Sequence, residues 1–164
     1  MQLVVVGIGN AVYEYSVKFA ASKYKYQLFA LIGEDEDLVR QIFAASDIYL
    51  APYRIDTFSE NELIALRYGA IPVVRSVGSL NDVVVNEENG YKFEKFSKMD
   101  MMDALNRALG CFEDKDKWHD MVGRAMRLNF SWGKTSGEYK EIYNIVANTD
   151  MKKCVKEILI FFQY

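Results

Sequence analysis

The segment Asp47–Leu80 constrains the fold more than any other part of the chain, because strand-like and helix-like runs alternate within it. Asp47–Pro52 and Ile71–Arg75 are short apolar runs of the kind found in buried parallel strands. Between them, Glu60–Tyr68 has helical spacing, and Gly69 follows at the position where a helix would end. A strand, a helix and a strand in this order predict a parallel βαβ unit.

The same alternation continues over the rest of the chain and predicts an α/β fold, a Rossmann-like parallel sheet flanked by helices. The predicted strands are Gln2–Val6, Gln27–Ile32, Asp47–Leu50, Ile71–Val74 and Tyr91–Phe93. The predicted helices are Val12–Ser22, Glu36–Ala45, Glu60–Tyr68, Lys98–Phe112, Asp116–Arg127 and a last one that follows Ser131 and reaches about Ala147. Asn81–Asn89 is polar and is expected to be a loop, and Thr149–Tyr164 fits either a helix or a strand.

Length and composition limit the classes of protein to which the chain can belong. With 164 residues we expect one domain over 1–164, and 51% hydrophobic residues are enough for a real core. A formal net charge of −3 gives no basic footprint, so nucleic acid is not an expected partner. The start lacks the pattern of a signal peptide, and no apolar run has the length of a membrane span. We therefore expect a cytoplasmic protein without a membrane partner.

Polar residues follow the two strands of the central segment. Arg54 and Asp56 lie in the loop after the first strand, and Gly78 and Ser79 follow the second. In an open α/β sheet, ligands bind outside the carboxyl ends of the strands. We therefore expect these four residues, together with Asn61, to line one cleft at that edge of the sheet.

These residues also carry a resemblance to a known family. The central segment resembles a pattern in the C-terminal lobe of bacterial glycogen synthases and plant starch synthases, approximately D-x-x-L-x-P-S-R-x-E-P-C-G, then A-L-x-Y-G and P-V-V-R-x-T-G-G-L. The positions kept in register are Asp47, Leu50, Pro52, Arg54, Ala65, Leu66, Tyr68, Gly69, Pro72, Val73, Val74, Arg75, Gly78 and Leu80. The similarity resumes at Phe130-Ser131-Trp132, so it covers most of the chain before the tail.

The resemblance implies a glycosyltransferase with two Rossmann-like lobes, the GT-B architecture, and an active site between them. It implies retaining transfer of glucose from ADP-glucose or UDP-glucose to an α-1,4-glucan acceptor, without a metal or another cofactor. Residues 1–164 would correspond to part of the lobe that binds the nucleotide sugar. The start of that lobe, with a phosphate-binding R-x-x-x-x-K motif, and the whole acceptor lobe are not among these residues.

Site residues follow from the resemblance position by position. Asp56 stands where the family has a catalytic glutamate, and Arg54, the arginine two residues before it, is implied to be catalytic as well. The remaining positions implied to bind the nucleotide sugar are Asn61, Val77, Gly78, Ser79 and Glu34. The chain departs from the family where Asp replaces the longer glutamate, where Ser59 replaces a glycine, and where Val77 replaces a threonine.

Two functions stay open at this stage. The chain is either the nucleotide-sugar lobe of a glucan synthase, completed by a separate acceptor-lobe chain or by self-association, or a non-catalytic module that binds a partner protein or glucan. In the common doubly wound order the first strand is central, and this chain starts at the second strand of the family lobe. We therefore expect a gap in the sheet, which either Val155–Phe162 or a strand from elsewhere could fill.

Overall fold

The computed structural model describes residues 1–33, 35–55 and 60–148. The chain divides into two compact units, residues 1–126 and residues 127–164, and each is described by itself. The expectation of one domain over residues 1–164 stays a prediction. The two alternatives for the tail from Thr149 lie outside the described residues.

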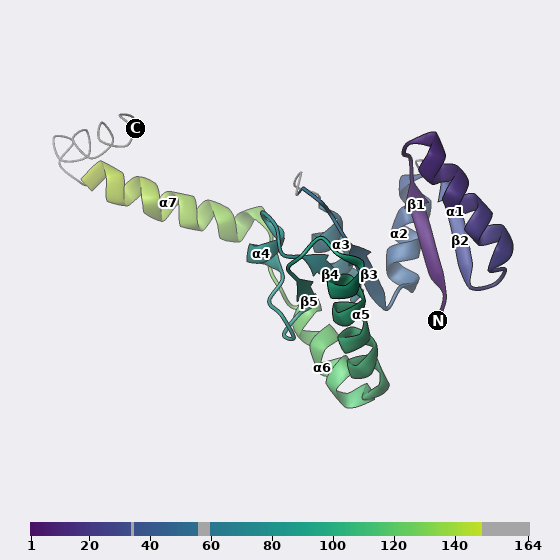
Figure 1. Ribbon diagram of the computed structural model, residues 1–164. Helices are drawn as coiled ribbons and strands as arrows, with labels where there is room; N and C mark the ends of the chain where they lie inside the picture. Colours follow the sequence, from purple (N-terminus) through teal and green to yellow (C-terminus); the bar gives the residue numbers. More distant parts are fainter. Residues whose placement is uncertain (34, 56–59, 149–164) are drawn as a thin grey trace. The chain divides into compact units, whose positions relative to one another are not determined.

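Strands and helices alternate along the first unit, as the sequence predicts (Figure 1). Its elements are β1 (Leu3–Gly7), α1 (Ala11–Lys23), β2 (Leu28–Ile32), α2 (Glu36–Ala45), β3 (Ile48–Ala51), α3 (Asn61–Tyr68), β4 (Ile71–Arg75), α4 (Leu80–Val83), β5 (Tyr91–Phe93), α5 (Lys98–Glu113) and α6 (Lys115–Met126). Each predicted strand and helix is found with shifts of only a few residues at its ends. The α/β fold class is therefore confirmed.

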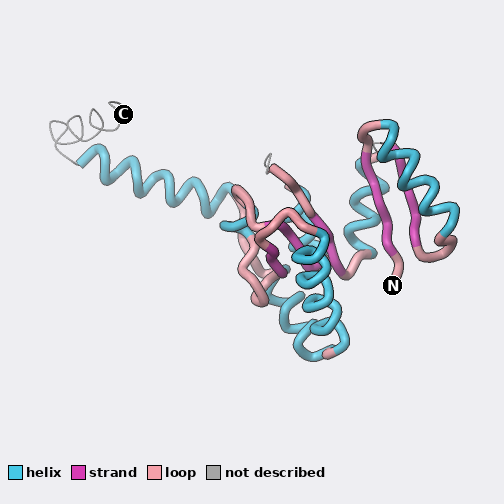
Figure 2. The backbone as a smooth tube through the Cα atoms, in the orientation of Figure 1, coloured by secondary structure: helices cyan, strands magenta, loops and turns pink. Residues whose placement is uncertain are grey.

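The strands of the described residues form two separate parallel sheets (Figure 2). One contains β1 and β2, with Leu3 opposite Leu28, and the other has the order β3-β4-β5. In the second sheet Ile48 lies opposite Ile71, and Val73 lies opposite Tyr91. Among the described residues β1 and β3 do not pair with each other, and the predicted gap in the sheet stays a prediction.

Local sequence signals explain where the helices begin and end. Asn10 caps α1 by accepting a hydrogen bond from the Val12 N–H at 2.9 Å, and Asp35 caps α2 in the same way at Leu38. Ser97 caps α5 by accepting from the N–H of Asp100 at 3.1 Å. Helix α3 ends at Gly69, whose φ of 81° is a left-handed conformation that glycine adopts without strain.

The core of the first unit lies between the β3-β4-β5 sheet and the helices α3, α5 and α6. Leu66 and Ile71 are fully buried there, and Trp118 of α6 packs edge-on against Phe112 of α5 with ring centroids 5.1 Å apart. The other buried members are Val73, Tyr91, Phe93, Ala104, Ala108, Met121 and Ala125. Ala104 and Ala108 of α5 are fully buried in this core.

Helix α4 was not predicted from the sequence, because the polar run that begins at Asn81 was expected to be a loop. The N–H groups of Val83 and Val84 donate to the carbonyls of Ser79 and Leu80 at 3.1 and 3.0 Å. Leu80 and Val84 are fully buried against Val74 and Ala51. Burial of these two side chains stabilises a single helical turn that has little helical pattern of its own.

The second unit contains α7 (Trp132–Asn148) among its described residues. Ser131 precedes the helix as predicted, and its carbonyl accepts from the N–H groups of Lys134 and Thr135. None of the side chains of α7 is buried. Within the described part of the chain, no helix combines the length and the apolar character that crossing a membrane requires.

Candidate functional site

The loops that follow β3, β4 and β5 meet at one edge of the sheet, and Arg75 links them. Its guanidinium donates to the carbonyl oxygen of Arg54 at 2.8 Å and lies 3.5 Å from that of Tyr53. It also donates to the carbonyl of Glu94 at 3.2 Å, and it lies over the ring of Phe96 at 5.6 Å from the centroid. Because Arg75 is the last residue of β4, the middle strand, it connects both neighbouring loops.

The loop after β4 is short and tightly hydrogen-bonded. Ser76 donates from its hydroxyl to Oδ1 of Asn81 at 2.5 Å, and the N–H of Val77 donates to the carbonyl of Arg75 at 2.9 Å. Gly78 has a φ of 47°, a left-handed conformation that a residue with a side chain adopts at a cost. Ser79 then begins the turn that becomes α4. The backbone at Gly78 and Ser79 is thus held in one shape at the carboxyl end of β4.

A polar cluster lies beside the loop after β3. The hydroxyls of Tyr49 and Tyr53 are 2.9 Å apart, and the Tyr49 ring packs against Phe43 at 5.3 Å. Burial raises the pKa of Tyr49, the hydrogen bond and charge of Tyr53 add to this, and a hydrogen bond from Asn61 acts in the opposite direction. Asn61, the first residue of α3, is therefore fixed against β3.

The predicted site residues fall into two groups. Arg54, Asn61, Val77, Gly78 and Ser79 all follow β3 or β4, which are neighbouring parallel strands. Asp56 and Glu34, the predicted carboxylate for the sugar and the residue predicted near the base, lie outside the described residues. The assignment of all seven to one nucleotide-sugar site therefore stays a prediction.

Arg75 and Tyr49 take part in the site although neither was predicted from the sequence to have a role there. Arg75 is a charged residue at the end of an otherwise apolar strand, just before the Val77–Ser79 loop. This position could have indicated from the sequence that Arg75 belongs to the site. Tyr49 gave no such signal, since an aromatic residue in a strand is ordinary. Its contact with Asn61 depends on the packing of α3 against β3.

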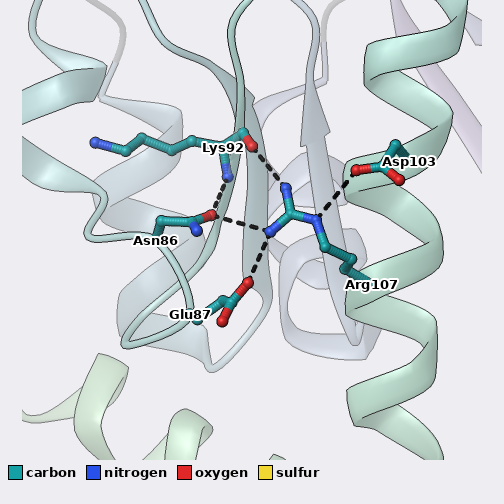
Figure 3. Close-up of polar contacts among 5 residues, drawn as sticks. All are labelled: Asn86, Glu87, Lys92, Asp103 and Arg107. Carbon is teal, nitrogen blue, oxygen red and sulfur yellow. Dashed lines mark hydrogen bonds and ion pairs between the residues drawn. The ribbon is translucent and has the colours of Figure 1, made fainter.

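A second polar cluster surrounds Arg107 of α5 but has a structural explanation (Figure 3). The guanidinium donates to Glu87 at 2.9 Å, to the Lys92 carbonyl at 2.9 Å, to Asp103 at 3.3 Å and to Asn86 at 3.4 Å. The contacts with Asn86 and Glu87 attach the segment before β5 to α5, and the contact with Lys92 attaches β5 itself. Because the donors of Arg107 are engaged in this way, we assign it no ligand.

Comparison with known proteins identifies the family. Residues 1–123 match the model of the glycosyl transferases group 1 family. The chain is 42% identical over 154 residues to glycogen synthase from Clostridium novyi. The aligned region covers 90% of this chain and 32% of that protein.

Solved structures agree with this match. The fold is similar to the catalytic domain of starch synthase IV from Arabidopsis thaliana bound to ADP and acarbose, with a TM-score of 0.78 and 29% identity over 87% of this chain and 32% of that one. HepE from Anabaena, solved with UDP-glucose, shares the fold with a TM-score of 0.62 and 17% identity over 76% of this chain and 35% of that one.

The chain spans about a third of the length of the curated relatives that it matches. The matching region is nevertheless long enough to assign the family, and it includes β1 to β5 and the loops at their carboxyl ends. The chain belongs to the glycosyl transferases group 1 family and is homologous to the C-terminal lobe of glycogen and starch synthases.

Proposed function

We propose that this chain forms part of the donor lobe of a retaining glucan synthase, which transfers glucose from ADP-glucose or UDP-glucose to an α-1,4-glucan. The observation that carries the proposal is the 42% identity over 154 residues to a glycogen synthase. The Arg75 contacts support it, because they attach the loop after β3 to the end of β4 at the edge where ligands of such sheets bind.

Each predicted residue has a role in this proposal. The leaving diphosphate needs positive charge and backbone N–H donors, which we assign to Arg54 and to the loop at Gly78 and Ser79. Asp56 would meet the glucosyl group and stabilise the positive charge that develops on it. Asn61 and Val77 would contact the rest of the donor, and Glu34 would lie near its base.

We expect weak donor binding by the chain alone. Arg75 is already engaged with backbone carbonyls, so Arg54 is the one arginine that we assign to the phosphates. Each missing charge-assisted hydrogen bond costs about 1.5–3 kcal/mol, which predicts ADP affinity no tighter than about the high micromolar range. Transfer would require the acceptor lobe, which we propose is supplied by another polypeptide segment.

Calorimetric titration of the purified chain with ADP, UDP and their glucose adducts tests this proposal. Arg54→Ala should weaken ADP binding about tenfold or more, because a charged contact to phosphate is lost. Arg40→Ala on α2 is the matched control and should bind as the unmodified chain does, because this arginine forms ion pairs with Glu36 and Asp37 of its own helix. Equal losses in the two variants, or no binding of any of the four ligands, would contradict the proposal.

A further inference from the structure

Arg75 binds the loop after β3 through backbone oxygens. Its Nη1 donates to the carbonyl of Arg54 at 2.8 Å and lies 3.5 Å from the carbonyl oxygen of Tyr53. Its Nε donates to the carbonyl of Glu94, in the loop after β5, at 3.2 Å. A guanidinium is planar and presents its donors in a fixed fork, so these contacts determine how the carbonyls of both loops are oriented.

Tyr53 is held from a second direction as well. Its hydroxyl lies 2.9 Å from that of Tyr49 in β3, and the Tyr49 ring packs against Phe43 of α2 with ring centroids 5.3 Å apart. Tyr53 is therefore attached to β3 by its side chain, while its carbonyl oxygen lies beside Arg75. Because a residue attached at two points rotates less than one attached at a single point, the peptide that follows Tyr53 has a defined orientation.

The orientation of these carbonyls determines where the neighbouring N–H groups point. The peptide bonds of the described residues are trans, and in a trans peptide the N–H and the C=O point in opposite directions. The carbonyls of Tyr53 and Arg54 face Arg75, so the N–H groups of Arg54 and Ile55 point to the other side. Within the described part of the chain, neither N–H donates to another protein group.

These two N–H groups lie in an accessible and positively charged environment. Arg54 and Ile55 are both exposed. Arg75 takes part in no ion pair among the described residues, so none of their carboxylates neutralises its charge. Hydrogen bonds that share a peptide group polarise one another, and a cation at the carbonyl of Arg54 therefore makes the N–H of Ile55 a stronger donor. The arrangement favours an anionic ligand.

A diphosphate fits these donors better than a neutral sugar does. Hydrogen bonds to a charged oxygen are about twice as strong as those between neutral groups. Successive backbone N–H groups in a turn form concave sites that bind phosphate in many proteins. The loop after β3 also starts at the carboxyl edge of the sheet, where ligands of such sheets bind.

We propose that the N–H groups of Arg54 and Ile55 bind the diphosphate of the nucleotide donor, and that Arg75 is the positioning residue that directs them toward it. The inference rests on the proposed function, from which it takes the ligand. It adds that an arginine bound to backbone carbonyls controls phosphate binding through the neighbouring loop, without a contact of its own to the ligand.

Amide resonances of the isotope-labelled full chain, titrated with inorganic pyrophosphate, test the contact. The amide protons of Arg54 and Ile55 should move downfield together and saturate along one binding curve, and ADP should move them in the same way. The amides of Leu3 and Ile71, which donate to the carbonyls of Gln27 and Asp47 at 2.8 Å, are internal controls and should stay in place.

A variant pair at Ile55 tests one N–H by itself. Ile55→Pro removes the N–H, whereas Ile55→Ala keeps it. The side chain is 73% exposed, so both variants should unfold thermally as the unmodified chain does. Ile55→Pro should bind pyrophosphate about tenfold or more weakly than Ile55→Ala, because a hydrogen bond to a charged group is lost. Equal binding by the two variants overturns the proposal.

Arg75→Ala tests whether the arginine acts through this peptide. Alone, it should weaken pyrophosphate binding about tenfold or more. Combined with Ile55→Pro, it should weaken binding by a smaller factor, because one of the two N–H groups that it directs is already absent. A purely structural role of Arg75 would give equal factors in the two backgrounds, and that result overturns the positioning role.

The outcomes separate this inference from the proposed function. Binding of ADP without movement of the Arg54 and Ile55 amides overturns the inference and leaves the proposed function standing. If pyrophosphate, ADP, UDP and their glucose adducts all fail to bind, both are overturned. The amide titration and the Ile55 pair do not use Arg75→Ala, so they decide the phosphate contact even if that variant fails to fold.

Discussion

Residues 3–32, which form β1, α1 and β2, and residues 48–126, which follow α2, have the same local design but very different burial. Both contain parallel apolar strands joined by helical crossovers. No residue of β1, α1 or β2 is buried, whereas four of the five residues of β4 are. Val12 and Phe19 on α1 are 69% and 60% exposed, although their type suits a core.

The difference shows that an apolar pattern identifies an element but does not bury it. Strand β4 has a strand on each side, and α3, α5 and α6 pack around its sheet, so its side chains lose contact with water. Among the described residues, strand β1 has one neighbour and correspondingly less cover. The stability of the first unit should therefore depend mainly on residues 48–126, and three predictions test this comparison.

The largest expected effect is a matched pair of leucine substitutions. Leu66→Ala in α3 removes a fully buried side chain and should lower the free energy of unfolding by about 2–5 kcal/mol. Leu3→Ala in β1 removes a side chain that is 45% exposed, and it should cost less than about 1 kcal/mol. Urea denaturation measures both. Equal losses would contradict the difference in burial between the two regions.

A smaller effect is expected from a pair of glycine substitutions. A Cβ at Gly90 would lie 2.7 Å from the carbonyl oxygen of Pro72 and 2.7 Å from Cγ1 of Val84. Because the Pro72 oxygen is part of the β4 backbone, we expect Gly90→Ala to cost about 1–3 kcal/mol. A Cβ at Gly9 meets nothing within 4 Å, so Gly9→Ala should change stability by less than about 0.5 kcal/mol. Thermal unfolding of the two variants would reveal whether the region around β4 is as tightly packed as this predicts.

The smallest effect is a pH dependence that arises in the region of β3. Burial raises the pKa of Tyr49 above its ordinary value of 10.0, so the unfolded chain loses this proton at lower pH than the folded chain. Above about pH 10 the unfolded state therefore binds fewer protons, and the free energy of unfolding should fall as the pH rises.

Tyr49→Phe tests this dependence. At neutral pH the variant should be less stable by about 0.5–1.5 kcal/mol, because its hydrogen bonds to Tyr53 and Asn61 are lost. Between about pH 9 and pH 11 it should lose less stability than the unmodified chain. Parallel curves for the two proteins over that range would show that Tyr49 does not cause the dependence.

Much of the fold could be predicted from the sequence, because strand and helix patterns are local. The strand at Ile71–Arg75 and the helix that ends before Gly69 follow from apolar spacing and from the conformational freedom of glycine. The candidate site could be predicted in part for a related reason. Once β3 and β4 are parallel neighbours, the loops that carry Arg54 and Gly78 must start from the same edge.

The tertiary structure alone decided which side chains hold these elements together. Helix α4 forms because Leu80 and Val84 are buried against β3 and β4, which no local pattern announces. Arg75 looked like a strand-end charge, but its guanidinium binds the backbone of the loops after β3 and β5. Such contacts join residues about twenty positions apart, so they depend on the packed arrangement of strands and not on local spacing.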